Sequence, residues 1–353
     1  MQTPTYRENE IDIDPAPKVV VYGAYGHTGR FVVSELASRG LTPVLAGRDR
    51  QKLEILTREI PGVEARVADV DDPGTLDRAL EGAAAVVNCA GPFAATSGPL
   101  IEATLRARLP YVDVAAEIEA NDDTFTVFGE RAAAEGAIVV PAMAFYGGLG
   151  DLLATAAMGD WAEADEVHVA YGLSGWHPTA GTRAAGAVSR QRRGGRHVSF
   201  HDGTLRYGSD ESVLTTWRFP APLGEREVRT EFSMADIVTI PRHLSVPDVF
   251  SYMTVTAATE LAADNTPAPV PVDESGKSDQ TFTVDVIVHR GAEKRRASAT
   301  GQDIYAVTGP LAVEAVVRIL TGRTKQTGVA PAGAMFDAAD FLDSLVPHVA
   351  WSL

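Results

Sequence analysis

The sequence contains a single cysteine, Cys89, among its 353 residues. An intramolecular disulfide is therefore impossible, and a metal site built from clustered cysteines is excluded as well. The eight histidines form no His-Glu-x-x-His motif, so the sequence predicts no metal site. A chain without disulfides suits a reducing compartment, and we expect a cytoplasmic location.

Long apolar runs and basic side chains are also scarce. No apolar run approaches the roughly 18 residues that a membrane-spanning helix needs, and the polar segment 2–14 does not resemble a signal peptide. The chain has 31 Lys and Arg against 47 Asp and Glu, a formal net charge of −16. Such a surface repels phosphate backbones and anionic lipids, so we expect neither nucleic acid nor a membrane as partner.

Between residues 17 and 150, short β-branched runs alternate with amphipathic stretches. We expect strands at 18–22, 42–46, 63–68, 84–88, 111–114 and 137–140, and helices at 28–39, 50–59, 73–80, 99–108 and 124–135. Strands that alternate with helices of about 10–15 residues indicate βαβ units and a parallel sheet. The sequence therefore predicts an α/β fold with a Rossmann-type doubly wound parallel sheet.

From residue 151 the pattern changes to alternating segments, which predict a second, α+β domain over 151–308 with a mixed or antiparallel sheet. Asp202-Gly203 between two such segments indicates a hairpin. The Pro-, Asp- and Ser-rich segment 263–278 is typical of a loop. Helices at 310–320 and 336–345 are expected to pack back across the domain join, within a C-terminal part over 309–353.

Three glycines follow the first expected strand and open the first helix: Gly23, Gly26 and Gly29. In a dinucleotide site the first permits a tight turn, the second lets the backbone approach a pyrophosphate, and the third lets the helix pack on the strand. The alternative is a purely structural turn, but the strand-turn-helix context favours nucleotide binding. We expect the whole turn to bind the cofactor, with the residues Gly23, Tyr25, Gly26, His27, Thr28 and Gly29.

The end of the second strand bears on the choice of cofactor. NAD-selective sites place an acid there, whereas this chain has Arg48, whose guanidinium suits the 2′-phosphate of NADP. Arg48 could instead be a surface arginine. We interpret Asp49 as the N-cap of the next helix. The sequence therefore predicts NADPH rather than NADH.

Two further segments are expected at the cofactor. Asp69 follows the third strand, where an acid can bind the adenine amino group or cap the helix that begins at Pro73. The small residues after the fourth strand are expected to line the nicotinamide ribose; they are Cys89, Ala90, Gly91, Pro92 and Phe93. Cys89 is interpreted as a packing residue rather than a nucleophile.

The segments VVVYGAYGHTGRFVVSELASRG, LAGRDRQKL, VVNCAGPF and YVDVAAE resemble, in order and spacing, the NADP-binding domain of saccharopine-dehydrogenase-like oxidoreductases, including the trans-acting enoyl reductase branch. The resemblance covers residues 18–150 well and is thinner afterwards. It implies a bacterial, homodimeric enzyme that uses NADPH to reduce a C=N or C=C bond of a small substrate, either free or attached to a carrier protein.

This chain departs from the group at the floor of the pocket. Members often carry Gly-Glu where it has Ala116-Glu117, and Gly-Phe-Asp where it has Ala144-Phe145-Tyr146. The resemblance therefore does not carry over a lysine-pathway substrate. We expect Glu117 to contact the substrate.

Three further residues are candidates for chemistry. Tyr146 follows the sixth strand, where its phenol would face the nicotinamide, and His177 lies in the first polar segment of the second domain. Either would donate the proton that follows hydride transfer. Arg183 would bind a substrate carboxylate. The alternatives are an aromatic side chain packed between domains for Tyr146 and ordinary exposed side chains for His177 and Arg183.

Arginines at 190, 192, 193 and 196 form a basic segment on an acidic protein. It is interpreted either as a solvated loop or as a contact for an anionic substrate or an acidic carrier protein. The function that the sequence predicts best is NADPH-dependent reduction of a C=N or C=C bond. Ketone reduction and a non-catalytic NADP-binding sensor are the alternatives, because a fold does not fix a function.

Overall fold

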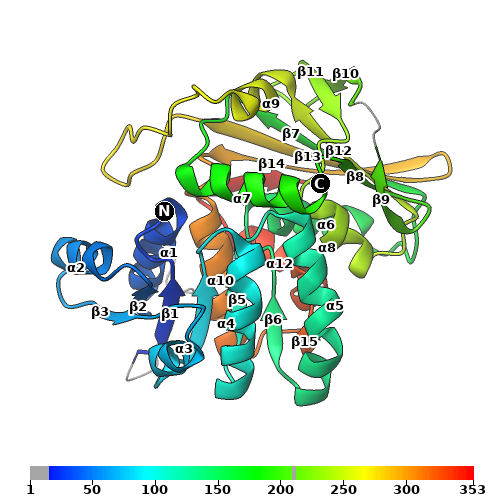
Figure 1. Ribbon diagram of the computed structural model, residues 1–353. Helices are drawn as coiled ribbons and strands as arrows, with labels where there is room; N and C mark the ends of the chain where they lie inside the picture. The colour runs from blue at the N-terminus through cyan, green and yellow to red at the C-terminus, as the bar shows by residue number, and fades with distance from the viewer. Residues whose placement is uncertain (1–15, 209–211) are drawn as a thin grey trace, which may run out of the picture.

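The computed structural model describes residues 16–208 and 212–353, which form two sheets with helices around and between them (Figure 1). The first sheet is entirely parallel, in the order β15-β6-β5-β4-β1-β2-β3. Its strands are β1 (Lys18–Tyr22), β2 (Thr42–Gly47), β3 (Glu64–Val67), β4 (Ala85–Asn88), β5 (Tyr111–Asp113), β6 (Ile138–Val140) and β15 (Gly328–Val329). Because β1 lies between β2 and β4, the strand order reverses there, which confirms the doubly wound layout.

The helices that connect these strands follow local signals. They are α1 (His27–Ser38), α2 (Arg50–Glu59), α3 (Pro73–Leu80), α4 (Phe93–Ala107) and α5 (Ile118–Glu135). The Asp72 carboxylate caps α3 by accepting from the Gly74 and Thr75 amides, and Pro73 occupies the first turn, where no amide donor is needed. α5 ends where Gly136 takes the left-handed conformation.

The second sheet is mixed. Its order is β10-β11-β12-β7-β13-β14-β16, with β8 paired to β12 and β9. Within this sheet only the β12–β7 pair is parallel among the described strands, so the α+β expectation is confirmed. The strands are β7 (Glu166–Leu173), β8 (His197–His201), β9 (Thr204–Gly208), β10 (Leu214–Arg218), β11 (Glu225–Thr230), β12 (Asp248–Thr254), β13 (Thr281–Arg290), β14 (Glu293–Gln302) and β16 (Val349–Ser352). The β8–β9 hairpin turns at Asp202 and Gly203, as predicted.

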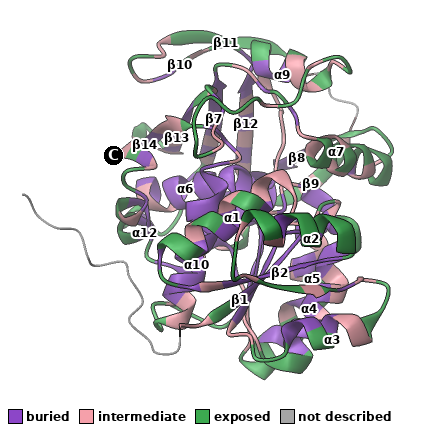
Figure 2. Cartoon of the chain, turned by 90° about the vertical axis from the view of Figure 1, so that its left-hand side faces the viewer, coloured by how far each residue is buried: buried purple, intermediate pink, exposed green. Residues whose placement is uncertain are grey.

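The other helices lie mostly between the sheets or at their edges. They are η1 (Phe145–Leu149), α6 (Gly150–Met158), α7 (Ala180–Arg192), α8 (Asp236–Thr239), η2 (Ile240–Arg242), α9 (Val255–Ala262), α10 (Thr308–Leu320), α11 (Ala332–Met335) and α12 (Ala338–Ser344). Figure 2 shows α6 largely buried, with exposed residues on α2 and α7. No described helix is long and apolar enough to cross a membrane.

Two expected helices were misplaced, and one helix was not expected at all. α7 is the unexpected one: its C-terminal end falls in the arginine-rich segment for which a solvated loop was one interpretation, and Thr179 caps its start by accepting from the Thr182 amide. α4 begins at Phe93 and carries Pro99 inside it, although Pro99 was taken as its start. α5 begins at Ile118 rather than 124. In each case packing on neighbouring elements stabilises turns that helix propensity alone does not favour.

The C-terminal part of the chain joins both sheets. α10 packs along α1, β15 adds a strand beside β6, and β16 adds a strand beside β14. The segment 309–353 therefore belongs to the sheets of both domains rather than resting on their join.

A buried ion-pair network fixes α10 in place. Glu314 is fully buried and accepts from the Arg318 guanidinium at 2.7 Å and from Arg39 at the end of α1. Arg318 is 1% exposed and reaches Asp340 of α12 at 2.6 Å. One carboxylate thus neutralises two buried cations from two helices.

We expect Glu314→Gln to destabilise the protein by about 3–5 kcal/mol, because it leaves two buried guanidiniums without their shared anion. Glu135→Gln is the control: that residue pairs with Arg131 on the surface, and its loss should cost less than about 1 kcal/mol. Urea unfolding measures both. Equal midpoints for the two variants would contradict the role given to Glu314.

Candidate functional site

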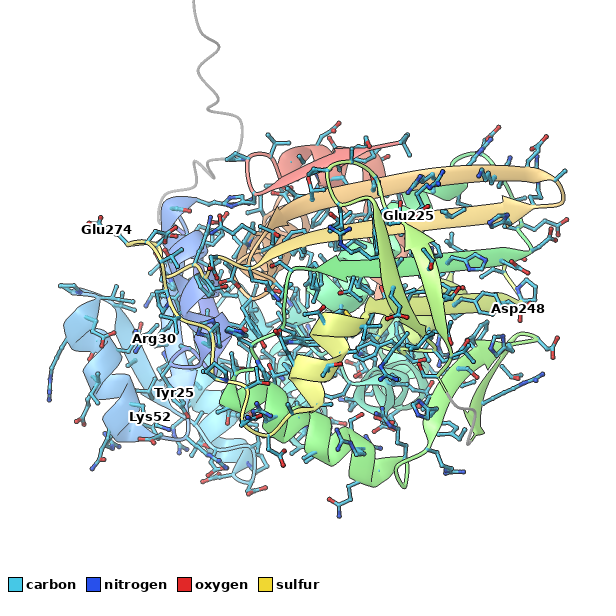
Figure 3. The ribbon with its side chains drawn as sticks, turned by 90° about the horizontal axis from the view of Figure 1, so that it is seen from above. Tyr25, Arg30, Lys52, Glu225, Asp248 and Glu274 are labelled. Atoms are coloured by element: carbon cyan, nitrogen blue, oxygen red, sulfur yellow. The ribbon has the colours of Figure 1, made fainter. Side chains whose placement is uncertain are left out.

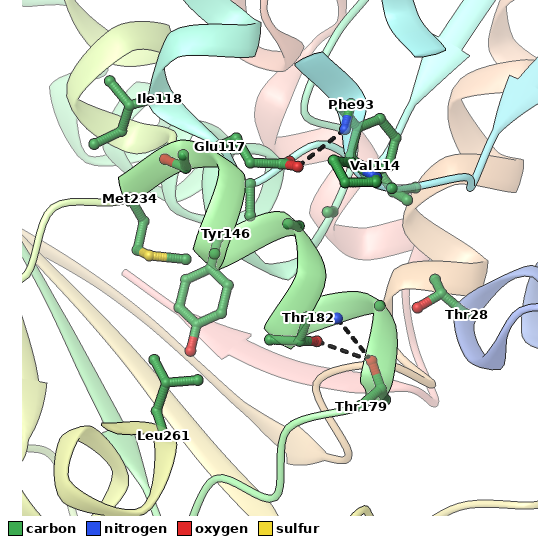
Figure 4. A pocket seen from close by; sticks show the side chains of 18 of the residues that line it. Thr28, Phe93, Val114, Glu117, Ile118, Tyr146, Thr179, Thr182, Met234 and Leu261 are labelled. Atoms are coloured by element: carbon green, nitrogen blue, oxygen red, sulfur yellow. Dashed lines mark hydrogen bonds between the residues drawn. The ribbon is translucent and has the colours of Figure 1, made fainter. Parts of the chain in front are cut away.

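A cavity of about 1440 Å³ extends from the glycine turn of the first sheet to the second sheet. Residues of both domains line it. Seen from above in Figure 3, Tyr25 and Lys52 mark the nucleotide side, and Asp248 and Glu225 mark the second sheet. In the close-up of Figure 4, Thr28, Glu117, Tyr146 and Thr182 come from four different elements.

The glycine turn has the geometry that its sequence predicted. Gly23 has φ +83°, and a Cβ there would stand 2.8 Å from the Cβ of Ala90. A Cβ on Gly29 would meet the Gly23 carbonyl oxygen at 2.3 Å, so α1 packs directly on the turn. Gly26 precedes α1 and offers no side-chain cap, so the first amides of α1 remain available to an anion in the cavity.

The end of β2 brings cations to the same cavity. Arg48 is exposed, lines the cavity, and has no hydrogen bond or ion pair among the described residues. Lys52 lies 5.5 Å over the Tyr25 ring. Asp49 accepts from the Lys52 amide at 3.1 Å, which confirms its role as the N-cap of α2. Lys52 also lies 3.6 Å from the Asp49 carboxylate, which lines the cavity too, so of the two cations Arg48 is the one left without an ion pair among the described residues and able to hold a phosphorylated ribose.

Asp69 does not line the cavity, whereas its neighbour Val70 does. The Asp69 carboxylate accepts from the Asp71 amide at 3.1 Å, and Asp72 rather than Asp69 caps α3. The side chain therefore shapes the turn after β3.

The loop after β4 is held by a buried amide. Asn88 is fully buried; its amide donates to Tyr111 and Thr96 at 3.1 Å, and its carbonyl accepts from the Ala90 amide at 3.0 Å. This network presents the small residues 89–93 to the cavity. Burial raises the pKa of the Cys89 thiol, which suits a packing residue and not a thiolate nucleophile.

Glu117 is the buried acid of this region. It is 8% exposed, lines the cavity, and one carboxylate oxygen accepts from the Phe93 amide at 3.0 Å (Figure 4). Burial raises its pKa to about 7, a shift to which the carboxylates of Asp113 and Glu119 add. A group with this pKa exchanges a proton near neutral pH.

Tyr146 also lines the cavity. Its ring stacks on Trp176 with the centroids 5.0 Å apart, and its buried hydroxyl has no hydrogen-bond partner within the part of the chain that the structure describes. Burial holds its pKa well above the ordinary value, so the phenol remains protonated. A buried donor without an acceptor is rare in folded proteins, which makes this hydroxyl a candidate for contact with a ligand.

The backbone around Tyr146 is strongly constrained. Gly147 has φ +95°, and a Cβ there would stand 2.7 Å from the Cβ of Ala142. The Gly147 amide donates to Asp236, whose other oxygen accepts from the Tyr171 hydroxyl at 2.7 Å. This buried contact links the segment after β6 to the second domain and orients the Tyr146 ring.

The start of α7 borders the cavity beside the glycine turn. No sequence pattern predicted this arrangement. The Tyr305 hydroxyl accepts from the Trp176 indole at 3.1 Å and lies 2.9 Å from the Thr182 hydroxyl. The Tyr305 ring meets the His27 ring edge-on at 5.1 Å, while the buried His27 Nε2 has no partner among the described residues. The Tyr305 hydroxyl, more than 120 residues from Thr182 in the sequence, thus fixes the start of α7 over α1.

The remaining two candidates lie elsewhere. His177 is exposed and does not line the cavity. The Arg183 guanidinium points to the segment after α9, where it donates to the carbonyls of Ala263 and Thr266. The exposed side chain weighed as the alternative describes His177. Arg183 is instead half-buried and bonded to backbone carbonyls, which differs from both the surface arginine and the substrate contact that the sequence suggested.

Among the described residues, no group of three His, Cys, Asp or Glu side chains could hold a metal ion. Among the side chains that line the cavity, Tyr146 carries a protonated phenol and Glu117 a carboxyl group whose pKa is near neutrality. Such groups can orient a polar substrate and supply a proton.

We expect Glu117 to titrate near pH 7 instead of near 4.5. Because the folded-state pKa is raised, its contribution to stability is complete below about pH 4.5 and is lost as the pH rises through about 7. Carbon-13 NMR of the carboxyl resonances, with Glu117→Gln to assign the signal, measures the midpoint. A midpoint near 4.5 would show that water reaches this carboxylate freely.

Residues 19–140 match the family model described as the saccharopine dehydrogenase NADP binding domain. A bovine saccharopine dehydrogenase-like oxidoreductase is 29% identical over 145 residues, covering 36% of this chain and 34% of the bovine protein. A probable mitochondrial saccharopine dehydrogenase-like oxidoreductase of Arabidopsis thaliana is 31% identical, covering 37% and 32%. A trans-acting enoyl reductase of Mycobacterium bovis is 30% identical, covering 39% and 33%.

The matched part thus spans about a third of these relatives' own length. Over the whole chain, the structure resembles apo saccharopine dehydrogenase (L-Glu forming) from Saccharomyces cerevisiae, with a TM-score of 0.67 at 12% identity, covering 96% of this chain and 99% of the yeast chain. That likeness shows a shared fold. Residues 19–140 therefore match the saccharopine dehydrogenase NADP binding domain, which confirms the resemblance found in the sequence.

Proposed function

We propose that this chain is an NADPH-dependent reductase that transfers hydride to a C=N or C=C bond of a small organic substrate. One observation carries the proposal: a single cavity contains both the dinucleotide-binding turn and a set of buried, proton-bearing side chains from both domains. When bound, NADPH supplies the hydride. The activity of the relatives cannot be transferred directly, because the match covers only the first domain.

The residues present fit the cofactor. The uncapped start of α1 suits its pyrophosphate, and Arg48 with Lys52 suits its 2′-phosphate. The residues after β4 would border the nicotinamide ribose, because ligands of doubly wound sheets bind where the strand order reverses.

Two side chains are placed to assist the reduction. The Tyr146 hydroxyl can donate a hydrogen bond to the substrate atom that becomes negative, but its raised pKa disfavours full loss of its proton. Glu117, with a pKa of about 7, releases a proton more readily. We propose that Tyr146 orients and polarises the substrate and that Glu117, which the sequence predicts only as a substrate contact, supplies the proton.

An enzyme and a non-catalytic sensor would have different cavities. A non-catalytic sensor needs only a cofactor site and an exposed surface for its partner, whereas here Trp176, Tyr146 and α7 enclose the space beyond the glycine turn. Enclosure with convergent polar groups favours an enzyme. A ketone would suit the same donors, so carbonyl reduction is the second candidate. The homodimeric state and the cytoplasmic location stay predictions.

We expect NADPH to bind at least about tenfold more tightly than NADH, because one charge-assisted pair contributes roughly 1.5–3 kcal/mol. Arg48→Ala should remove most of this difference. The control is Arg50→Ala, an exposed arginine two residues away that does not line the cavity. Fluorescence titration measures the affinities, and equal affinities in the unaltered protein would overturn the cofactor assignment.

We expect Tyr146→Phe and Glu117→Gln each to lower turnover by about 10²-fold without changing NADPH affinity, as is typical when a proton donor or a polarising group is lost. A screen of imines, enoyl thioesters and ketones for NADPH consumption provides the substrate. Tyr252→Phe, a hydroxyl that does not line the cavity, is the control. If both cavity variants keep full turnover, the proton comes from water or another residue.

A further inference from the structure

The end of the cavity farthest along α7 is lined by arginines. They are Arg190 in the last turn of α7, Arg193 at its C-cap, Arg196 before β8, and Arg229 on β11. We call these four residues the arginine end. The sequence showed three of them as a basic segment, but only the fold brings Arg229 to them and turns all four toward one cavity.

Among the described residues, one carboxylate beside the arginine end is Glu231, which lines the same cavity two residues along from Arg229 and pairs with His201 at 3.6 Å. Arg193 has the only ion pair of the four among the described residues, a long contact of 3.8 Å to Glu119. Arg196 donates to the Arg193 carbonyl and lies 5.4 Å over the Tyr207 ring. The side chains of Arg190 and Arg229 have no hydrogen bond or ion pair among the described residues.

Arg193 gives a more specific indication that an anion binds at the arginine end. Its Nε is buried and has no acceptor among the described residues. A buried N–H without an acceptor costs free energy, and a ligand anion in the cavity would remove that cost. The neighbouring Arg192 shows the contrast: it does not line the cavity and pairs with Asp123 at 2.7 Å.

An apolar wall lies between the arginine end and the proposed reactive groups. Trp176 stacks on Tyr146 and lies 6.3 Å from the Phe232 ring, and Met234 and Leu261 complete this wall (Figure 4). The cavity thus has an acid at Glu117, apolar side chains beside Tyr146, and four arginines at its far end, with the Glu231 carboxylate two residues from Arg229. A ligand that matches all three parts has an apolar body with an anion at one end.

We propose that the arginine end binds a carboxylate of the substrate, so that the substrate class is an unsaturated compound with an apolar body and a terminal carboxylate. The planar guanidinium matches a carboxylate with two parallel hydrogen bonds. On a protein of net charge −16, a cationic pocket also attracts such an anion selectively. This proposal rests on the proposed function for the reducible bond, but the binding of the anion is testable without turnover.

The experiment measures binding to the NADP-saturated protein by calorimetry. The probes are 3-phenylpropanoate, 5-phenylpentanoate and 7-phenylheptanoate, each compared with its neutral amide. We expect at least one carboxylate to bind about tenfold more tightly than its amide, because a charge-assisted hydrogen bond contributes roughly 1.5–3 kcal/mol. The preference should weaken as salt is added.

Two matched pairs of variants locate the site. Arg229→Gln and Arg193→Gln should each reduce the preference to less than about threefold, whereas Arg226→Gln and Arg192→Gln should leave it unchanged. Arg226 lies on the same strand as Arg229 but is exposed and outside the cavity. Phenyl phosphate tests for a phosphate-selective end: tighter binding of phenyl phosphate than of every carboxylate would overturn the carboxylate assignment.

The outcomes separate the two proposals. If NADPH binding is normal, three results would overturn the proposal that the arginine end binds a carboxylate. They are equal binding of carboxylate and amide at every length, no binding of any probe, and a preference that survives both Arg229→Gln and Arg193→Gln. Failure of the unaltered protein to bind NADPH would overturn the proposed function instead.

Discussion

The loops after β1 and β4 approach each other so closely that a Cβ on Gly23 would stand 2.8 Å from the Cβ of Ala90. Only a residue without a side chain fits there. Because β1 lies between β2 and β4, the two connections then leave toward opposite faces of the sheet. The crevice between them defines the site: Arg48 stands on one side, after β2, and Glu117 on the other, after β5. The remaining parts of the cavity are arranged around this contact.

The second domain turns the crevice into an enclosed site. The Tyr305 hydroxyl holds Trp176 and the first turn of α7 over the glycine turn, and Tyr146 packs beneath Trp176. Burial at this part of the cavity raises the pKa of Glu117 and of Tyr146. At the arginine end Arg190 and Arg196 are exposed, so an anion bound there would remain partly solvated. The second domain therefore sets the protonation of the inner side chains and brings the arginines to the same cavity.

The C-terminal part of the chain holds the two halves of the site together. It runs beside α1 as α10, adds β15 to the first sheet and adds β16 to the second. The fully buried Glu314 links this segment to the end of α1 through Arg39. Since α1 carries the anion-binding turn at its other end, the cofactor half and the substrate half share one continuous support.

The sequence by itself determined the first domain and its glycine turn, because each depends on short-range geometry. A strand, a glycine turn and a helix start are adjacent in the chain, and Arg48 and the Asp49 cap follow from the end of one strand. Only the tertiary structure decided the rest. The sequence did not predict α7, because this helix depends on packing against α4 and α5. His177 lies outside the cavity while Tyr305 and Arg229 lie within it, since the folded chain brings these last two to the site from segments far apart in sequence. The near-neutral pKa of Glu117 comes from burial between those segments, a property that no local pattern records.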